Sequence, residues 1–102
     1  MSDSHALSNS GLVHPTVQVG VNVTVGHASL VGYGAQTDSP TIIGDNVVIG
    51  AFCIVYFGAN IGQHVLLDDF CKVCPGVTIG DRTKVLYGKH VYDDATIGSD
   101  CI

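Results

Sequence analysis

Aliphatic residues recur at every sixth position along almost the whole chain. From Val13 to Ile97 this series departs from aliphatic character only at Thr37. Its members are Val13, Val19, Val25, Val31, Thr37, Ile43, Ile49, Val55, Ile61, Leu67, Val73, Ile79, Val85, Val91 and Ile97. A strict short repeat indicates that one small structural unit is stacked on itself many times, so the repeat has to be interpreted before any single residue.

The other positions of the six-residue repeat have preferences of their own. When the aliphatic residue is counted as the first, the second is most often Gly, the fifth is small or β-branched, and the fourth is often Gly, Asn or Asp. The fifth residue and the next first residue are two apart, so they lie on the same face of a short strand. The second to fourth residues then form a turn, where Gly, Asn and Asp supply positive φ angles. This spacing predicts a chain that winds as a coil rather than folding into hairpins.

Two stretches carry the pattern aliphatic-Gly-x-x-small-x, namely IIGDNVVIGAFC (42–53) and TIGDRTKV (78–85). This pattern resembles the hexapeptide repeat of left-handed parallel β-helix proteins, and the resemblance covers residues 13–102. It implies an all-β fold, a left-handed parallel β-helix of about five coils of 18 residues. We expect residues 1–12 to be an N-terminal tail or cap on the domain 13–102. Because the repeat stops in mid-coil at Ile102, we also expect a fragment of a longer chain.

Stacking of every third repeat predicts an apolar column on the outer surface of one face. Its positions are Leu12, Leu30, Val48 and Leu66. A continuous apolar stripe of this kind marks a contact surface. Since proteins of the resembled family are typically trimers, the stripe favours a homotrimer that packs through this face.

Composition excludes several classes of protein. There are four Lys and Arg against nine Asp and Glu, a net charge of −5 at pH 7, so no basic surface for nucleic acid is expected. No apolar run approaches the ~18 residues of a membrane span, and the N-terminus does not match a secretory signal. We interpret Cys53 and Cys71, which should stack, as core residues and not as a disulfide. Reduced cysteines favour a cytoplasmic protein.

The resembled family is dominated by acyltransferases, whose chemistry needs a base to deprotonate the attacking amine or hydroxyl. Histidine suits this role at neutral pH. Active sites of the family lie between neighbouring subunits, so the base is expected at a corner beside the interface. His64, in IGQHVL and two residues before Leu66, meets this expectation. His27, in VGHASL, is the second candidate, and stacking of every third repeat predicts that it lies at the same corner.

A second segment of the sequence bears on the identity of the acceptor. The segment DFCKVCPGVTIGD (69–81) resembles the DFVHISPG segment of nucleotide-sugar N-acetyltransferases. The family's catalytic His corresponds to Gln63, one place before His64, and its second His corresponds to Lys72. The resemblance implies transfer of an acetyl group from acetyl-CoA, as co-substrate and not as bound cofactor, to an amino or hydroxy group of a small sugar-like acceptor. We expect Gln63 and Lys72 to bind the acceptor or the pantetheine arm.

Two other functions remain open. Hexapeptide-repeat domains also serve as non-catalytic trimerising modules of larger assemblies. Carbonic anhydrases of the same fold hold a metal with three His, two of them five residues apart, but the residue five after His64 is Asp69, so no metal site is predicted. Cys74 is a possible nucleophile at a turn, although no His partner for it is evident from the sequence.

Overall fold

The computed structural model describes residues 12–34 and 40–101. The expected N-terminal tail or cap, the irregular repeat at Thr37 and the side chain of Leu12 lie outside the described residues. Within the described part every regular element is a strand, so the predicted all-β class is confirmed. The strands are β1 (Leu12–Val13), β2 (Gln18–Val19), β3 (Thr24–Val25), β4 (Leu30–Tyr33), β5 (Ile42–Ile43), β6 (Val48–Ile49), β7 (Ile54–Tyr56), β8 (Asn60–Ile61), β9 (Leu66–Leu67), β10 (Lys72–Val73), β11 (Thr78–Ile79), β12 (Lys84–Val85), β13 (His90–Val91) and β14 (Thr96–Ile97).

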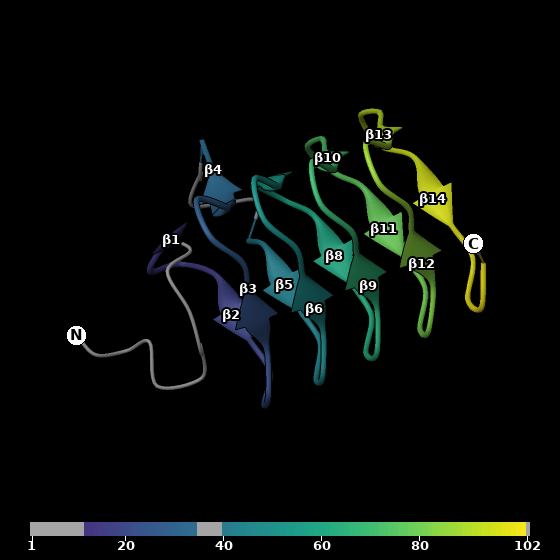
Figure 1. Ribbon diagram of the computed structural model, residues 1–102, viewed down its shortest axis with the longest axis horizontal. Helices are drawn as coiled ribbons and strands as arrows, with labels where there is room; N and C mark the ends of the chain where they lie inside the picture. The colour runs from purple at the N-terminus through teal and green to yellow at the C-terminus, as the bar shows by residue number, and fades with distance from the viewer. Residues whose placement is uncertain (1–11, 35–39, 102) are drawn as a thin grey trace.

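These strands form three parallel sheets, and the chain visits the sheets in turn (Figure 1). Sheet A has the order β1-β4-β7-β10-β13, sheet B the order β2-β5-β8-β11-β14, and sheet C the order β3-β6-β9-β12. One passage through the sheets is called a coil below. Each strand pairs with the strand one coil away, which is consistent with a parallel β-helix.

The distance in sequence between paired residues is not constant. Leu30 pairs with Ile54, four repeats further along the chain, whereas Ile54 pairs with Lys72, only three repeats further. The reason is the connection from sheet A to sheet B after β4. Val31 in β4 and Ile43 in β5 are two repeats apart, whereas Val55 in β7 and Ile61 in β8 are one repeat apart. One whole repeat is therefore taken up in this connection.

The longer connection corrects the predicted apolar column. Leu12 and Leu30 pair with each other in sheet A, whereas Val48 and Leu66 pair with each other in sheet C. A constant step of three repeats does not hold across the connection after β4, so the four residues do not share one face. The outward column of sheet A continues with Ile54, and that of sheet C begins at Thr24.

The core is built from the first and fifth positions of the repeat. Val55, Val73 and Leu67 have no exposed surface, and neither does Cys53. Cys53 and Cys71 are both buried and free, in agreement with their interpretation as core residues. Since every coil buries only a few side chains, each coil depends on its neighbours for stability.

The fourth residue of each repeat has the predicted positive φ in most turns. Examples are Asn46, at 59°, and Gly58, at 78°. Most second-position glycines have a different role. A Cβ placed on Gly62 would collide with the backbone and side chain of Asp81 in the next coil. Close approach between coils, and not φ, therefore requires glycine there.

Candidate functional site

His64 lies in the turn between β8 and β9, at the corner between sheets B and C. Its φ is 59°, in the left-handed region that favours Gly or Asn. The backbone N–H of His64 donates to the carbonyl of Asp45 at 2.9 Å, which fixes the turn on the preceding coil. The side chain is exposed and its ring makes no hydrogen bond with any residue that the structure describes. The imidazole is therefore presented outward on a fixed backbone.

The neighbours of His64 along this corner are polar. The corner column runs Asn22, Asn46, His64, Arg82 and Asp100, all with positive φ. Asn22 donates to the amide oxygen of Asn46 at 3.3 Å, and Arg82 makes a two-point ion pair with Asp100 at 2.8 and 3.1 Å. This exposed ion pair lowers the pKa of Asp100. The polar groups on both sides of His64 are thus engaged with each other and not with its ring.

His27 does not lie at the same corner as His64. The step of four repeats places it at the corner between sheets C and A, where its backbone carbonyl accepts the N–H of Phe52 at 2.9 Å. The constant step of three repeats used in the sequence argument fails at the longer connection after β4. The two candidate bases therefore belong to different edges of the molecule.

Aromatic rings form a continuous ladder at the corner that holds His27. The His27 and Phe52 rings meet edge to face at 5.9 Å, Phe52 and Phe70 stack at 5.2 Å, and Phe70 meets Tyr87 at 5.5 Å. We call these four residues the aromatic ladder. Phe52 and Phe70 are half exposed, at 49% and 51%, and both have positive φ, which is unusual for a bulky residue. Tyr33 does not join the ladder, because it contacts Tyr56 at another corner.

Gln63 and Lys72 are not brought together in one copy of the chain. Gln63 is exposed beside His64, and its backbone N–H donates to the Asp81 carboxylate at 3.0 Å. Lys72 lies on β10 in sheet A, which does not border the corner of His64. Its ammonium group sits 5.5 Å from the centre of the Tyr56 ring, a cation–π contact. A substrate that touches both His64 and Lys72 would have to lie between two copies.

A thiol–imidazole contact lies at the corner between sheets A and B. The Sγ of Cys74, directly after β10, is 3.1 Å from Nε2 of His90 on β13. The register that pairs Lys72 with His90 brings the two strands side by side, and the imidazole reaches diagonally to Cys74. The His90 ring also stacks on Tyr92 at 4.2 Å. No partner for Cys74 is evident from the sequence. Lys72 and His90 are three repeats apart, so stacking predicts that β10 and β13 are neighbours, but it does not predict the diagonal contact.

Charged groups of both signs act on the thiol of Cys74. Burial raises the pKa of its thiol, a hydrogen bond and the negative charge of Asp93 raise it further, and the positive charge of Lys72 lowers it. The thiol is thus protonated at neutral pH and has a base next to it.

Cys71 and Cys74 also stand at Cys-x-x-Cys spacing, but both are free. The Cys71 thiol donates instead to the carbonyl of Leu86 at 3.2 Å.

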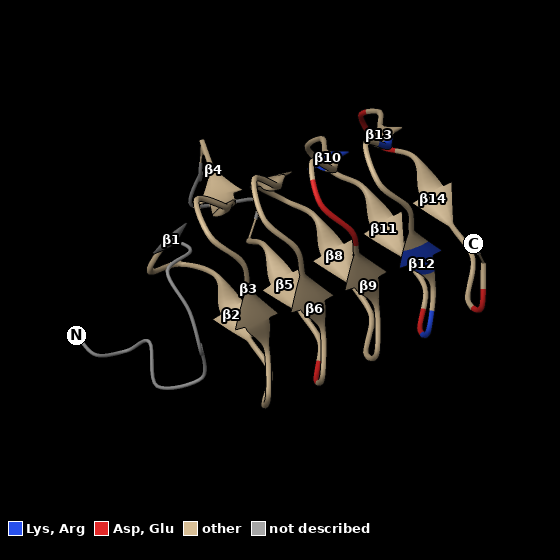
Figure 2. Ribbon diagram, viewed as in Figure 1, with Lys and Arg blue, Asp and Glu red and all other residues tan. Residues whose placement is uncertain are grey.

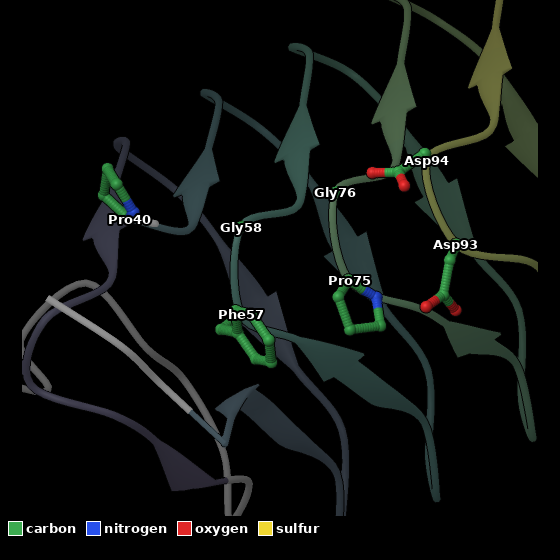
Figure 3. Close-up of a pocket in the computed structure, with 7 residues that line it drawn as sticks. All are labelled: Pro40, Phe57, Gly58, Pro75, Gly76, Asp93 and Asp94. Carbon is green, nitrogen blue, oxygen red and sulfur yellow. The ribbon is translucent and has the colours of Figure 1, made fainter. Parts of the chain in front are cut away.

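An open pocket of about 320 Å³ lies at the same corner (Figure 3). Phe57, Pro75 and Asp93 line it from successive coils, and Asp94 adds a second carboxylate. The pocket therefore combines apolar side chains with two carboxylates. Its negative charge favours a cationic or hydroxylated group in this pocket over an anionic one.

Charge is distributed unevenly along the chain. The four basic residues all fall between Lys72 and Lys89, and Figure 2 shows them toward the C-terminal coils.

Within residues 12–34 and 40–101 no three His, Cys, Asp or Glu side chains are grouped so that they could hold a metal ion. Among these residues there is also no helix of the length and apolar character needed to cross a membrane.

No protein-family model matches the chain, and a search of curated proteins finds no significant match.

Proposed function

We propose that the protein is a CoA-dependent acyltransferase of the hexapeptide-repeat superfamily with a left-handed β-helix. It transfers an acetyl group from acetyl-CoA to an amino or hydroxy group of a sugar-like acceptor, with His64 as the general base. The repeat pattern and the three parallel sheets support the assignment to this superfamily. The acceptor class rests on the resemblance of two segments, HPT (14–16) and DFCKVCPGV (69–77), to sugar acyltransferases.

The single observation that carries the proposal is the presentation of His64. Its exposed imidazole stands at a corner, on a positive-φ backbone, two residues before the outward-facing Leu66 of β9. A base has to reach the proton of the attacking group within hydrogen-bond distance, and none of the described residues competes for the ring. Lys72 from a neighbouring copy is the proposed contact for the donor, because one copy does not bring it to His64.

The proposal includes a homotrimer in which the corner between sheets C and A of one copy packs against the next copy beside its His64, so that Lys72 of sheet A can reach that site. The aromatic ladder runs along this corner, and its flanks add Leu86 and Val48, which are 41% and 42% exposed. An exposed apolar surface that follows one edge over successive coils favours contact with another copy. This surface replaces the predicted column, which is split between two sheets.

The test is acetyl transfer to a panel of amino sugars and hydroxylated sugars, measured as release of free CoA. His64→Gln should lower kcat by roughly 100-fold or more while acetyl-CoA binding, measured by calorimetry, stays unchanged. His14→Gln is the matched control, since it removes an exposed imidazole between β1 and β2, away from both His64 and the aromatic ladder. Turnover that survives His64→Gln would remove His64 as the base.

A trimerising module without catalysis is the second candidate, and the exposed aromatic ladder is the observation that favours it. The two functions are separated by ligand binding. A trimer that binds no acetyl-CoA at millimolar concentration and turns over no acceptor would be such a module. Binding of acetyl-CoA together with turnover would exclude it.

A further inference from the structure

The four cysteines, all within the described part of the chain, have different partners. The Cys53 thiol donates to the carbonyl of Asp68 at 3.0 Å, and the Cys71 thiol donates to that of Leu86 at 3.2 Å. Cys101 is exposed and has only a distant carbonyl, of Ser99, at 3.6 Å. Cys74 alone contacts an imidazole. Cys74 belongs to the buried core cluster, as Cys53 and Cys71 do, but it differs from them in this contact with an imidazole.

We propose that Cys74 is a nucleophile that takes up an acyl group from a thioester, with His90 as its general base. In the His90 tautomer whose Nε2 carries no proton, the 3.1 Å contact between Sγ and Nε2 is the hydrogen bond through which a base activates a thiol, and Asp93 is a second hydrogen-bond partner of the same thiol. Stacking on Tyr92 holds the His90 ring in place. Cys74 as a residue is 6% exposed, whereas Cys53 has no exposed surface.

The chemistry is an exchange of one thioester for another. The Cys74 sulfur forms a bond to the acyl carbon as the bond from that carbon to the donor sulfur breaks. His90 takes the proton from the Cys74 thiol and gives it to the departing thiolate. The products are an acyl-Cys74 thioester and a free donor thiol, so no oxidant or reductant is needed.

Neighbouring charges fit this exchange. Because burial and Asp93 keep the thiol protonated at rest, the proton has to be removed during the attack, which is the role given to His90. Lys72, which pairs with His90 across β10 and β13, stabilises negative charge at the sulfur. The site thus holds a nucleophile, a base and a cation together.

The inference rests on the proposed function only for the choice of donor, a thioester. The experiment incubates the full chain with acetyl-CoA, without acceptor, and follows acetylation by intact and peptide mass spectrometry. We expect one acetyl group per chain, on Cys74, released by hydroxylamine. Cys74→Ser should abolish this adduct, and His90→Gln should slow its formation roughly 100-fold. Cys101→Ser is the control and should leave the rate unchanged.

Three results would overturn the inference. They are equal acetylation of Cys101 and Cys74, a rate that does not change in His90→Gln, and the absence of any acyl-thioester on the wild-type chain. His90 is exposed, so His90→Gln carries the test if the buried Cys74→Ser variant does not fold. Acetylation of Cys74 without transfer to any acceptor would support this inference and contradict the proposed function. Transfer of the acetyl group to an acceptor without any acyl-Cys74 would support the proposed function and contradict this inference.

Discussion

The side-chain oxygen of Ser29 accepts a hydrogen bond from the backbone N–H of Cys53 at 2.9 Å and donates one to the carbonyl of Gly50 at 2.6 Å. Ser29 is fully buried, so its hydroxyl joins two backbone groups of the next coil away from water. Thr83 makes the equivalent pair of bonds, to Gly98 and Cys101, near the other end of the chain. A hydroxyl at the fifth position of a repeat is thus a link between coils.

We predict that Ser29→Ala destabilises the fold by about 1–3 kcal/mol, because it leaves a buried N–H and a buried carbonyl unsatisfied. Ser29→Thr should retain most of the stability, since Thr83 shows that threonine fits the same role. Urea unfolding followed by circular dichroism measures both. Equal stability of Ser29→Ala and the wild type would show that the two backbone groups find other partners.

Close approach between coils gives a second prediction. A Cβ at Gly62 would meet Asp81 of the next coil, whereas a Cβ at Gly98 would meet only Cys101 Sγ at an ordinary 3.7 Å. Gly62→Ala should therefore cost about 1–3 kcal/mol of folding free energy, the usual cost of overpacking. Gly98→Ala is the matched control and should be neutral or slightly stabilising, because it only reduces the freedom of the unfolded chain. A stable Gly62→Ala would mean that neighbouring coils can move apart easily.

The repeat predicts most of the fold because each of its positions has a local physical reason. Core positions, turns and the stacking of Cys53 on Cys71 follow from a period of six and from residues that tolerate positive φ, such as Asn46. The connection between Val31 and Ile43 does not follow from the period. Thr37 is the one residue that departs from the aliphatic series, but a period of six does not say how many repeats separate a strand of sheet A from the next strand of sheet B.

The candidate site shows the consequence of that one connection. A constant step of three repeats brings His27 to the corner of His64, whereas the actual step of four repeats brings it to Phe52. The contact between Cys74 and His90 was missed for another reason. It is diagonal between neighbouring strands, and stacking rules predict directly paired residues only. The direction of a side chain decides such a contact.

The aromatic ladder allows folding and association to be separated. In Phe70→Asn, two ring pairs are lost, each worth about 0.5–1.5 kcal/mol besides the buried area, and relief at a positive φ of 62° returns about 1 kcal/mol, because Asn tolerates this region. We predict a variant that is less stable than the wild type but still folds, and that is monomeric, measured by light scattering after size exclusion. Val21→Asn is the control, since Val21 is also exposed, at 61%, but lies away from the ladder. A Phe70→Asn variant that keeps the wild-type trimeric mass would place the interface elsewhere.

The negative charge of Asp93 and the positive charge of Lys72 shift the pKa of the Cys74 thiol in opposite directions. Burial and Asp93 raise the pKa of the thiol, so alkylation of Cys74 by iodoacetamide should reach half its maximal rate above the ordinary pH for a cysteine. Asp93→Asn removes a raising effect and should shift that midpoint to lower pH. Lys72→Met removes a lowering effect and should shift it to higher pH. Rates are measured for the Cys74 peptide by mass spectrometry, with the exposed Cys101 in the same sample as the reference for reagent and pH. Shifts of the same sign in both variants would contradict the charge arrangement around the thiol.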